Sequence, residues 1–100
     1  MIKLTDKELE IVMAILRKHI PTFEILVFGS RYNGNTHDHS DLDLAIKGPH
    51  KVDILSMADL RDEFQNSHLP FRVDIVDFNS ISPEFQEVIL KTSVSLKIYK

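Results

Sequence analysis

Three aspartates have the type and spacing to do chemistry together. Asp41 and Asp43 stand two residues apart in the alternating segment DLDLAIK, and Asp74 stands in the middle of FRVDIVDF. In a strand, residues two apart point to the same face, so Asp41 and Asp43 are predicted to share one face while the leucine between them turns to the core. Their Cα atoms would lie roughly 6.5 to 7 Å apart, within reach of a shared metal site. Two carboxylates that close require a cation to compensate their charge.

Asp74 is the third candidate because of its position in its strand. Asp74 and Asp77 are three residues apart and point to opposite faces, so only one of them can join the first pair. Asp74 lies between apolar residues, where an unpaired carboxylate is costly, whereas Asp77 near the strand end can reach water or cap a turn. Three carboxylates in a chain without cysteine favour Mg²⁺ or Mn²⁺, which leave coordination positions for phosphate oxygens.

A glycine and a serine follow the apolar run FEILVF. Gly29 would let the backbone approach a phosphate, Ser30 adds a hydroxyl donor and Arg31 a positive charge, while the amides of a following helical turn form an anion site. Each feature also has a plainer interpretation: an ordinary turn, a solvated arginine, and aspartates on the exposed face of an amphipathic strand. The three features together favour a nucleotide and metal site.

Other polar residues could enlarge this site. His37 and His39 flank Asp38 in a polar loop, but no third ligand follows at a recognisable spacing, so we favour a loop without zinc. Arg72 could contact a phosphate or form a salt bridge with a neighbouring acid, and we favour the salt bridge.

The elements that must position these residues can be read from hydrophobic periodicity. A capping box, Thr5 to Glu8, opens a helix that stops at Pro21, and Ser82 caps another helix. The expected order is a helix to residue 20, a strand at 23–28, a short helical turn at 30–34, a strand at 41–47, a helix at 52–65, a strand at 71–78, a helix at 83–91 and a strand at 93–99. This order predicts an α/β (α+β) fold, with helices packed on a small mixed sheet of about four strands.

The helix at residues 52–65 should be amphipathic. Its apolar residues Ile54, Met57, Leu60 and Phe64 fall on one face, which we expect to be core.

Composition narrows the class of protein. With 100 residues, 43% hydrophobic and 27% charged, we expect one folded domain spanning residues 1–100. A net charge of −3 and no block of Lys or Arg argue against stable nucleic-acid binding. No stretch approaches the roughly 20 apolar residues that span a membrane, and the N-terminus does not resemble a signal peptide, so we expect a cytoplasmic protein.

The pattern GS, then DLD about ten residues later, then a strand aspartate, resembles the minimal nucleotidyltransferases of the DNA polymerase beta superfamily. The resemblance covers essentially the whole chain and implies a nucleotidyltransferase-like fold. It implies that Gly29 and Ser30, with Arg31, bind the triphosphate and that Asp41 and Asp43 bind Mg²⁺ or Mn²⁺. Asp74 resembles the third carboxylate, which helps to hold the metal that activates the attacking hydroxyl.

The resemblance also implies a function and a partner. Small bacterial members commonly pair with a helical HEPN-domain protein as antitoxin and toxin, which suggests transfer of AMP from ATP, or of NMP from another NTP, to a hydroxyl of that partner. The alternatives are a non-catalytic antitoxin that covers its partner and, less favoured, a phosphotransferase. Asn33 stands where relatives often carry a second basic residue, so phosphate contacts from this loop should be weaker. Completion of the acceptor site by another chain, and assembly as a homodimer or hetero-oligomer, are left open.

Overall fold

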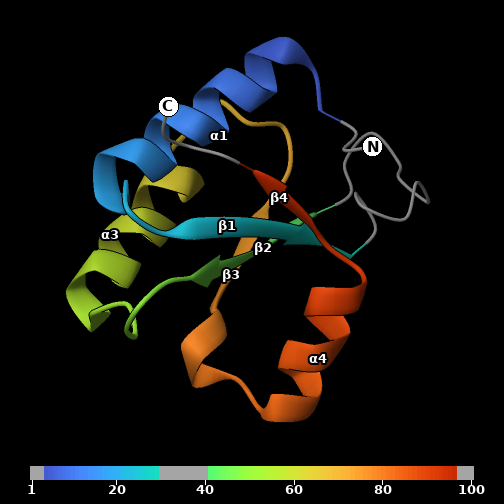
Figure 1. Ribbon diagram of the computed structural model, residues 1–100. Helices are drawn as coiled ribbons and strands as arrows, with labels where there is room; N and C mark the ends of the chain where they lie inside the picture. The colour runs from blue at the N-terminus through green and yellow to red at the C-terminus, as the bar shows by residue number, and fades with distance from the viewer. Residues whose placement is uncertain (1–3, 30–40, 97–100) are drawn as a thin grey trace.

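The computed structural model describes residues 4–29 and 41–96, which build a four-stranded mixed sheet with helices on both of its faces (Figure 1). In chain order the elements are α1 (Asp6–His19), β1 (Glu24–Phe28), β2 (Leu42–Lys47), α3 (Ile54–Gln65), β3 (Val73–Asp77), the 3₁₀ turn η1 (Phe78–Ser80), α4 (Pro83–Lys91) and β4 (Val94–Leu96). This confirms the predicted fold class and the order of these elements. The predicted helical turn at 30–34 and the end of the last strand, 97–99, lie outside the described residues.

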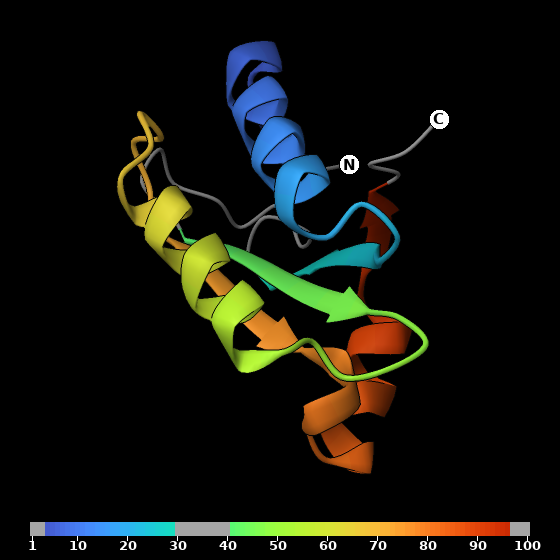
Figure 2. The same cartoon turned by 90° about the vertical axis from the view of Figure 1, so that its left-hand side faces the viewer.

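The sheet order β3-β2-β1-β4 places β2 in its interior. β1 pairs antiparallel with β2 and with β4, whereas β2 pairs parallel with β3. A parallel pair needs a crossover connection, and α3 supplies it, running alongside β3 (Figure 2). β2 therefore has a strand on each side, and a residue on β2 has neighbours from both β1 and β3.

The helix ends follow the capping signals. The Thr5 hydroxyl accepts a hydrogen bond from the Glu8 amide at 3.1 Å while the Thr5 amide donates to the Glu8 carboxylate at 2.9 Å, which confirms the capping box of α1. Ser82 caps α4 with Pro83 in its first turn, as expected, and Asp53 caps α3, which was not predicted. Among the described residues, no helix combines the length and the apolar character that crossing a membrane would require.

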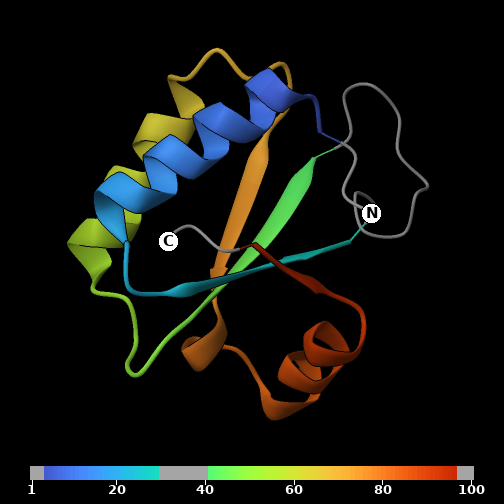
Figure 3. The ribbon, with the colours of Figure 1, turned by 45° about the horizontal axis from the view of Figure 1, so that its top comes forward.

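The sheet face that α1 and α3 cover holds the larger part of the core (Figure 3). Alternation along β2 sends Leu42, Leu44 and Ile46 to this face, and each is fully buried. From α3 come Met57, Leu60 and Phe64, as predicted.

The prediction for Ile54 was wrong: this side chain is 85% exposed. The reason is that α3 begins at this residue, so its first turn lies beyond the part of the helix that packs on the sheet.

The opposite face, which we call the α4 face, has a much smaller core. Its buried members are Leu26, Ala45, Phe78 and Ile89. α4 lies on this side of the sheet and η1 follows directly from β3, so among the described elements no helix lies above the beginnings of β2 and β3 (Figure 3). The polar residues that alternate with Leu42 and Leu44 open onto this face.

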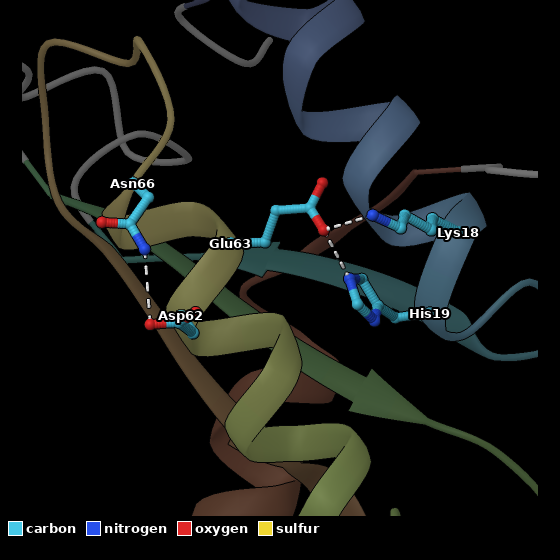
Figure 4. Close-up of polar contacts among 5 residues, drawn as sticks. All are labelled: Lys18, His19, Asp62, Glu63 and Asn66. Carbon is cyan, nitrogen blue, oxygen red and sulfur yellow. Dashed lines mark hydrogen bonds and ion pairs between the residues drawn. The ribbon is translucent and has the colours of Figure 1, made fainter.

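A polar contact also joins α1 to α3. One carboxylate oxygen of Glu63, on α3, lies 2.8 Å from His19 Nε2 and 3.0 Å from Lys18 Nζ, both at the end of α1 (Figure 4). The two helices are therefore held by an ion pair and a hydrogen bond in addition to their shared apolar core.

Candidate active site

Asp43 lies between its neighbours on two strands. In the sheet, Asp43 pairs with Phe28 on β1 and with Asp74 on β3. Directly paired residues on parallel strands send their side chains to the same face, and Ala45 and Val76, two residues further along each strand, both belong to the α4-face core. Asp74 therefore shares a face with Asp43, which is the geometry that the proposed carboxylate site requires.

Asp41 immediately precedes β2 and completes the group. Its carboxylate adds to the negative potential at Asp43, and a single arginine, Arg72, lies within ion-pair distance of both Asp41 and Asp74. The structure thus brings all three predicted aspartates to one corner of the α4 face. We call Asp41, Asp43 and Asp74 the carboxylate cluster.

Gly29 borders the carboxylate cluster at the end of β1. Its φ of +78° lies in the left-handed region, which side chains disfavour. A Cβ atom built on Gly29 would lie 2.2 Å from Asp43 Oδ2, so no other residue fits here without displacing that carboxylate. The backbone at Gly29 thus lies against the Asp43 carboxylate, and its approach to a phosphate stays a prediction.

Several predicted residues cannot be placed. Ser30 and Arg31, assigned to the triphosphate, lie outside the described residues, and so do Asn33, His37 and His39. Their roles stay predictions.

The electrostatics of the cluster favour a cation. Burial raises the pKa of the Asp43 carboxyl above its ordinary 3.8, and the charges of Asp74 and then Asp41 raise it further, while Arg72 opposes the rise. A half-buried carboxylate beside two like charges holds its negative charge at a cost. Any positive charge that binds there relieves the repulsion.

Arg72 forms the salt bridge that we favoured. Its Nε lies 3.2 Å from Asp74 Oδ1, and its Nη2 lies 3.4 Å from Asp74 Oδ2 and 3.8 Å from Asp41 Oδ2. The sequence signal for the first contact is the spacing, since Arg72 and Asp74 are two residues apart on one strand face. The contact of the same guanidinium with Asp41 was not evident from the sequence, because it depends on how β2 and β3 are aligned.

The donor set suits Mg²⁺ or Mn²⁺, because it consists of carboxylate oxygens that repel one another until a cation joins them. Within residues 4–29 and 41–96, however, no three acidic or histidine side chains already converge as ligands would around one ion. Two of the three candidate ligands face Arg72 instead. The residues therefore fit the ion in chemistry and charge, with side-chain rotation needed to gather them.

Asp77 has the structural role expected of it. Its carboxylate caps η1 and accepts hydrogen bonds from the amides of Val52 and Asn79, at 2.9 and 3.1 Å, and from the Ser80 hydroxyl at 3.0 Å. These contacts tie the start of α3 to the end of β3. Asp77 is not part of the carboxylate cluster.

A groove of about 670 Å³ runs along the outer edge of β3, beside α3. Arg72 and Asp74 form part of its wall, and the aromatic rings of Phe64 and Phe71 form another part. The groove gives a second molecule a route to Asp74 from the side of the sheet.

Comparison with known proteins agrees with this geometry. A family model described as polymerase beta, nucleotidyltransferase matches residues 10–99. A Haemophilus influenzae protein named probable protein adenylyltransferase MntA is 39% identical over 92 residues, which cover 92% of this chain and 81% of the relative.

Two solved structures extend the comparison. A crystal structure of a toxin-antitoxin with AMP-PNP matches with a TM-score of 0.72 and 28% identity, over 86% of this chain and 69% of that chain. A structure of a tri-AMPylated Shewanella oneidensis HEPN toxin in complex with MNT antitoxin matches with a TM-score of 0.63 and 25% identity, over 84% of this chain and 64% of that chain.

These matches confirm the resemblance read from the GS, DLD and strand-aspartate pattern. The family match includes every residue of the candidate site, and the structural matches have the same arrangement of sheet and helices. The chain belongs to the polymerase beta nucleotidyltransferase family, and it is a nucleotidyltransferase.

Proposed function

We propose that this protein transfers AMP from ATP to a hydroxyl group of a HEPN-domain partner protein, in a reaction that depends on Mg²⁺ or Mn²⁺, and that it acts as the antitoxin of a toxin-antitoxin pair. The observation that carries the proposal is the pairing of Asp43 with Asp74 beside Gly29. It sets two strand carboxylates next to a backbone position without a side chain, on a part of the sheet that none of the described helices covers.

The relatives support the nucleotide and the partner. One relative is named as a protein adenylyltransferase, one similar structure contains AMP-PNP, and another contains an AMPylated HEPN toxin. Transfer of AMP to a HEPN-domain protein is the activity that accounts for all three.

The chain's own residues would share the work as follows. Asp41, Asp43 and Asp74 would hold the divalent ion, and Gly29, with Ser30 and Arg31, would receive the triphosphate. The bound ion supplies positive charge that neutralises the phosphates and aligns the reacting groups. The acceptor oxygen forms a bond to the α-phosphorus, the bond from that phosphorus to the pyrophosphate oxygen breaks, and the acceptor's proton is lost.

The groove along β3 gives the acceptor a place. Asp74 is the cluster member that lines it, so an acceptor hydroxyl that enters there arrives at the carboxylate assigned by family resemblance to its activation. The groove is open at the sheet edge, which suits an acceptor carried by another protein chain.

Two radioactive labels separate this function from its alternatives. The protein is incubated with its HEPN-domain partner, Mg²⁺ and ATP labelled at either the α or the γ phosphate. Label from the α position on the partner supports AMP transfer, label from the γ position shows phosphorylation, and protection of cells from the partner without either label supports neutralisation by binding alone.

Replacement of the central carboxylate is the sharpest test of the site. Asp43→Asn keeps the shape of the side chain and removes its charge, and we expect AMP transfer to fall by about a hundredfold or more, because charge stabilisation at the reacting phosphate is lost. Asp59→Asn, on the exposed surface of α3, is the matched control and should retain full activity. Normal transfer by Asp43→Asn would exclude the assigned site.

A further inference from the structure

Arg72 occupies the oxygens that a metal ion would need. Its Nε and Nη2 approach the two oxygens of Asp74, at 3.2 and 3.4 Å, in the side-on arrangement by which a guanidinium engages both oxygens of a carboxylate. The same Nη2 lies 3.8 Å from Asp41 Oδ2. One guanidinium thus holds two members of the carboxylate cluster.

Charge balance explains why Arg72 adopts this position. The cluster carries three carboxylates, and among the described residues Arg72 is the cation that lies against them. An arginine guanidinium does not lose its proton in proteins, so this counter-ion stays charged. It lowers the repulsion that the cluster would otherwise suffer.

The contact is also easy to break. The Arg72 side chain is 75% exposed, and those of Asp41 and Asp74 are 45% and 43% exposed. Ion pairs at such exposed positions contribute little to stability, because water solvates the separated charges almost as well. The guanidinium can therefore swing into solvent without disturbing the core.

From this geometry we propose that Arg72 is a resident counter-ion of the carboxylate cluster, which must release Asp74 when a divalent cation binds and which thereby weakens metal binding. The inference rests on the cation site of the proposed function. Ion and guanidinium compete for the same Asp74 oxygens, and two positive groups cannot share them without repulsion. Release of Arg72 is then part of assembling the site.

The test is Mn²⁺ binding, measured by the electron paramagnetic resonance of the free ion, with no nucleotide or partner present. Arg72→Gln removes the competing charge, and we expect it to bind Mn²⁺ roughly three- to tenfold more tightly than the unmodified protein, the range that loss of a weak exposed ion pair and of some repulsion allows. Arg72→Lys keeps the charge but not the planar fork, and should fall between the two.

The matched control is Lys47→Gln, which makes the same change in net charge. Lys47 is the last residue of β2, at the end of the strand away from Asp43, where its Nζ lies 3.9 Å from Glu24 Oε1. Its removal should leave the affinity for Mn²⁺ nearly unchanged, so a gain confined to Arg72→Gln cannot arise from net charge alone.

Thermal unfolding gives a second measurement. Metal-free Arg72→Gln should melt at a lower temperature than the unmodified protein, because its cluster has lost its counter-ion. Saturating Mn²⁺ should raise the melting temperature of Arg72→Gln by more than it raises that of the unmodified protein.

The contrary outcomes are distinct. Equal affinity in Arg72→Gln and the unmodified protein would show that Arg72 is a surface ion pair without influence on the site. Weaker binding in Arg72→Gln would show that it orients Asp74 for the metal, and either result overturns the inference while leaving the proposed function intact. If the unmodified protein binds no Mn²⁺, the cation site itself fails.

Discussion

The two faces of the sheet differ in what they bury. Along β2, Leu42, Leu44 and Ile46 face α1 and α3 and are fully inaccessible to solvent, whereas Asp43 faces the opposite side and is only half buried. Within residues 4–29 and 41–96, four residues form the buried core of the α4 face, against fifteen on the other face. Side chains of one strand thus serve two purposes: one face stabilises the fold, and the other is free to carry charges that would be intolerable in a core.

This separation permits a site that is electrostatically unfavourable on its own. Three carboxylates in one corner lower stability until a cation joins them, and the α1 and α3 face supplies the stability that makes this tolerable. Substitutions on the two faces should therefore affect different measurements.

The largest expected effect on stability comes from a substitution on the sheet face that α1 and α3 cover. Leu44 is fully buried and has Val27 and Ile75 as its neighbours on the two flanking strands. Leu44→Ala leaves a cavity and should lower the free energy of unfolding by about 3 kcal/mol. Urea denaturation of the metal-free protein measures this, with Asp43→Asn as the comparison, since loss of a repelled charge should leave stability equal or slightly higher. If Asp43→Asn were destabilised as strongly as Leu44→Ala, the two faces would not be separate in function.

The sequence was sufficient to predict the features that depend on the geometry of a single strand or helix. Alternation along DLDLAIK indicated which side chains of β2 share a face, and the three-residue spacing of Asp74 and Asp77 showed that only one of them could join Asp43. Both inferences use only the geometry of a single strand.

What could not be predicted depends on alignment between elements. The contact of Gly29 with Asp43 follows from the antiparallel pairing of β1 and β2, and the reach of Arg72 to Asp41 follows from the parallel pairing of β2 and β3. The exposure of Ile54 depends on where α3 begins relative to the sheet. Neither a strand register nor the offset of a helix is encoded in local periodicity.

Gly29 allows a smaller effect to be tested at the border of the site. Gly29→Ala forces a residue with a side chain into φ +78°, which should cost about 1 to 2 kcal/mol of stability, and its Cβ would displace the Asp43 carboxylate. We expect this variant to lose both stability, in urea denaturation, and AMP transfer. Gly48→Ala is the matched control: its Cβ would meet the Phe23 ring at 2.3 Å, on the core side of the sheet, so it should lose stability but retain affinity for Mn²⁺. Equal Mn²⁺ affinity in both glycine variants would show that the backbone at Gly29 does not shape the site.

The smallest expected effect comes from the polar contact between α1 and α3 (Figure 4). Hydrogen bonds from His19 and then Lys18 lower the pKa of the Glu63 carboxyl below its ordinary 4.5, so the folded state favours the charged form. Its contribution to stability is therefore present above pH 4.5 and is lost as the pH falls through the lowered pKa. Glu63→Gln should be slightly less stable than the unmodified protein at pH 7, and thermal unfolding at decreasing pH should show the difference closing below about pH 4.5.

Asp62 provides the control for this contact because its carboxylate accepts a hydrogen bond, at 3.3 Å, from Asn66, the residue that caps the end of the same helix. Asp62→Asn makes the same change in charge one residue away without separating the two helices, and it should affect stability less than Glu63→Gln does at pH 7. Neither variant should alter AMP transfer or Mn²⁺ affinity, because both lie on α3, which packs on the face opposite the carboxylate cluster. A loss of AMP transfer in Glu63→Gln at unchanged stability would mean that the face covered by α1 and α3 also shapes the site. Stability and chemistry would then not be divided between the two faces of the sheet.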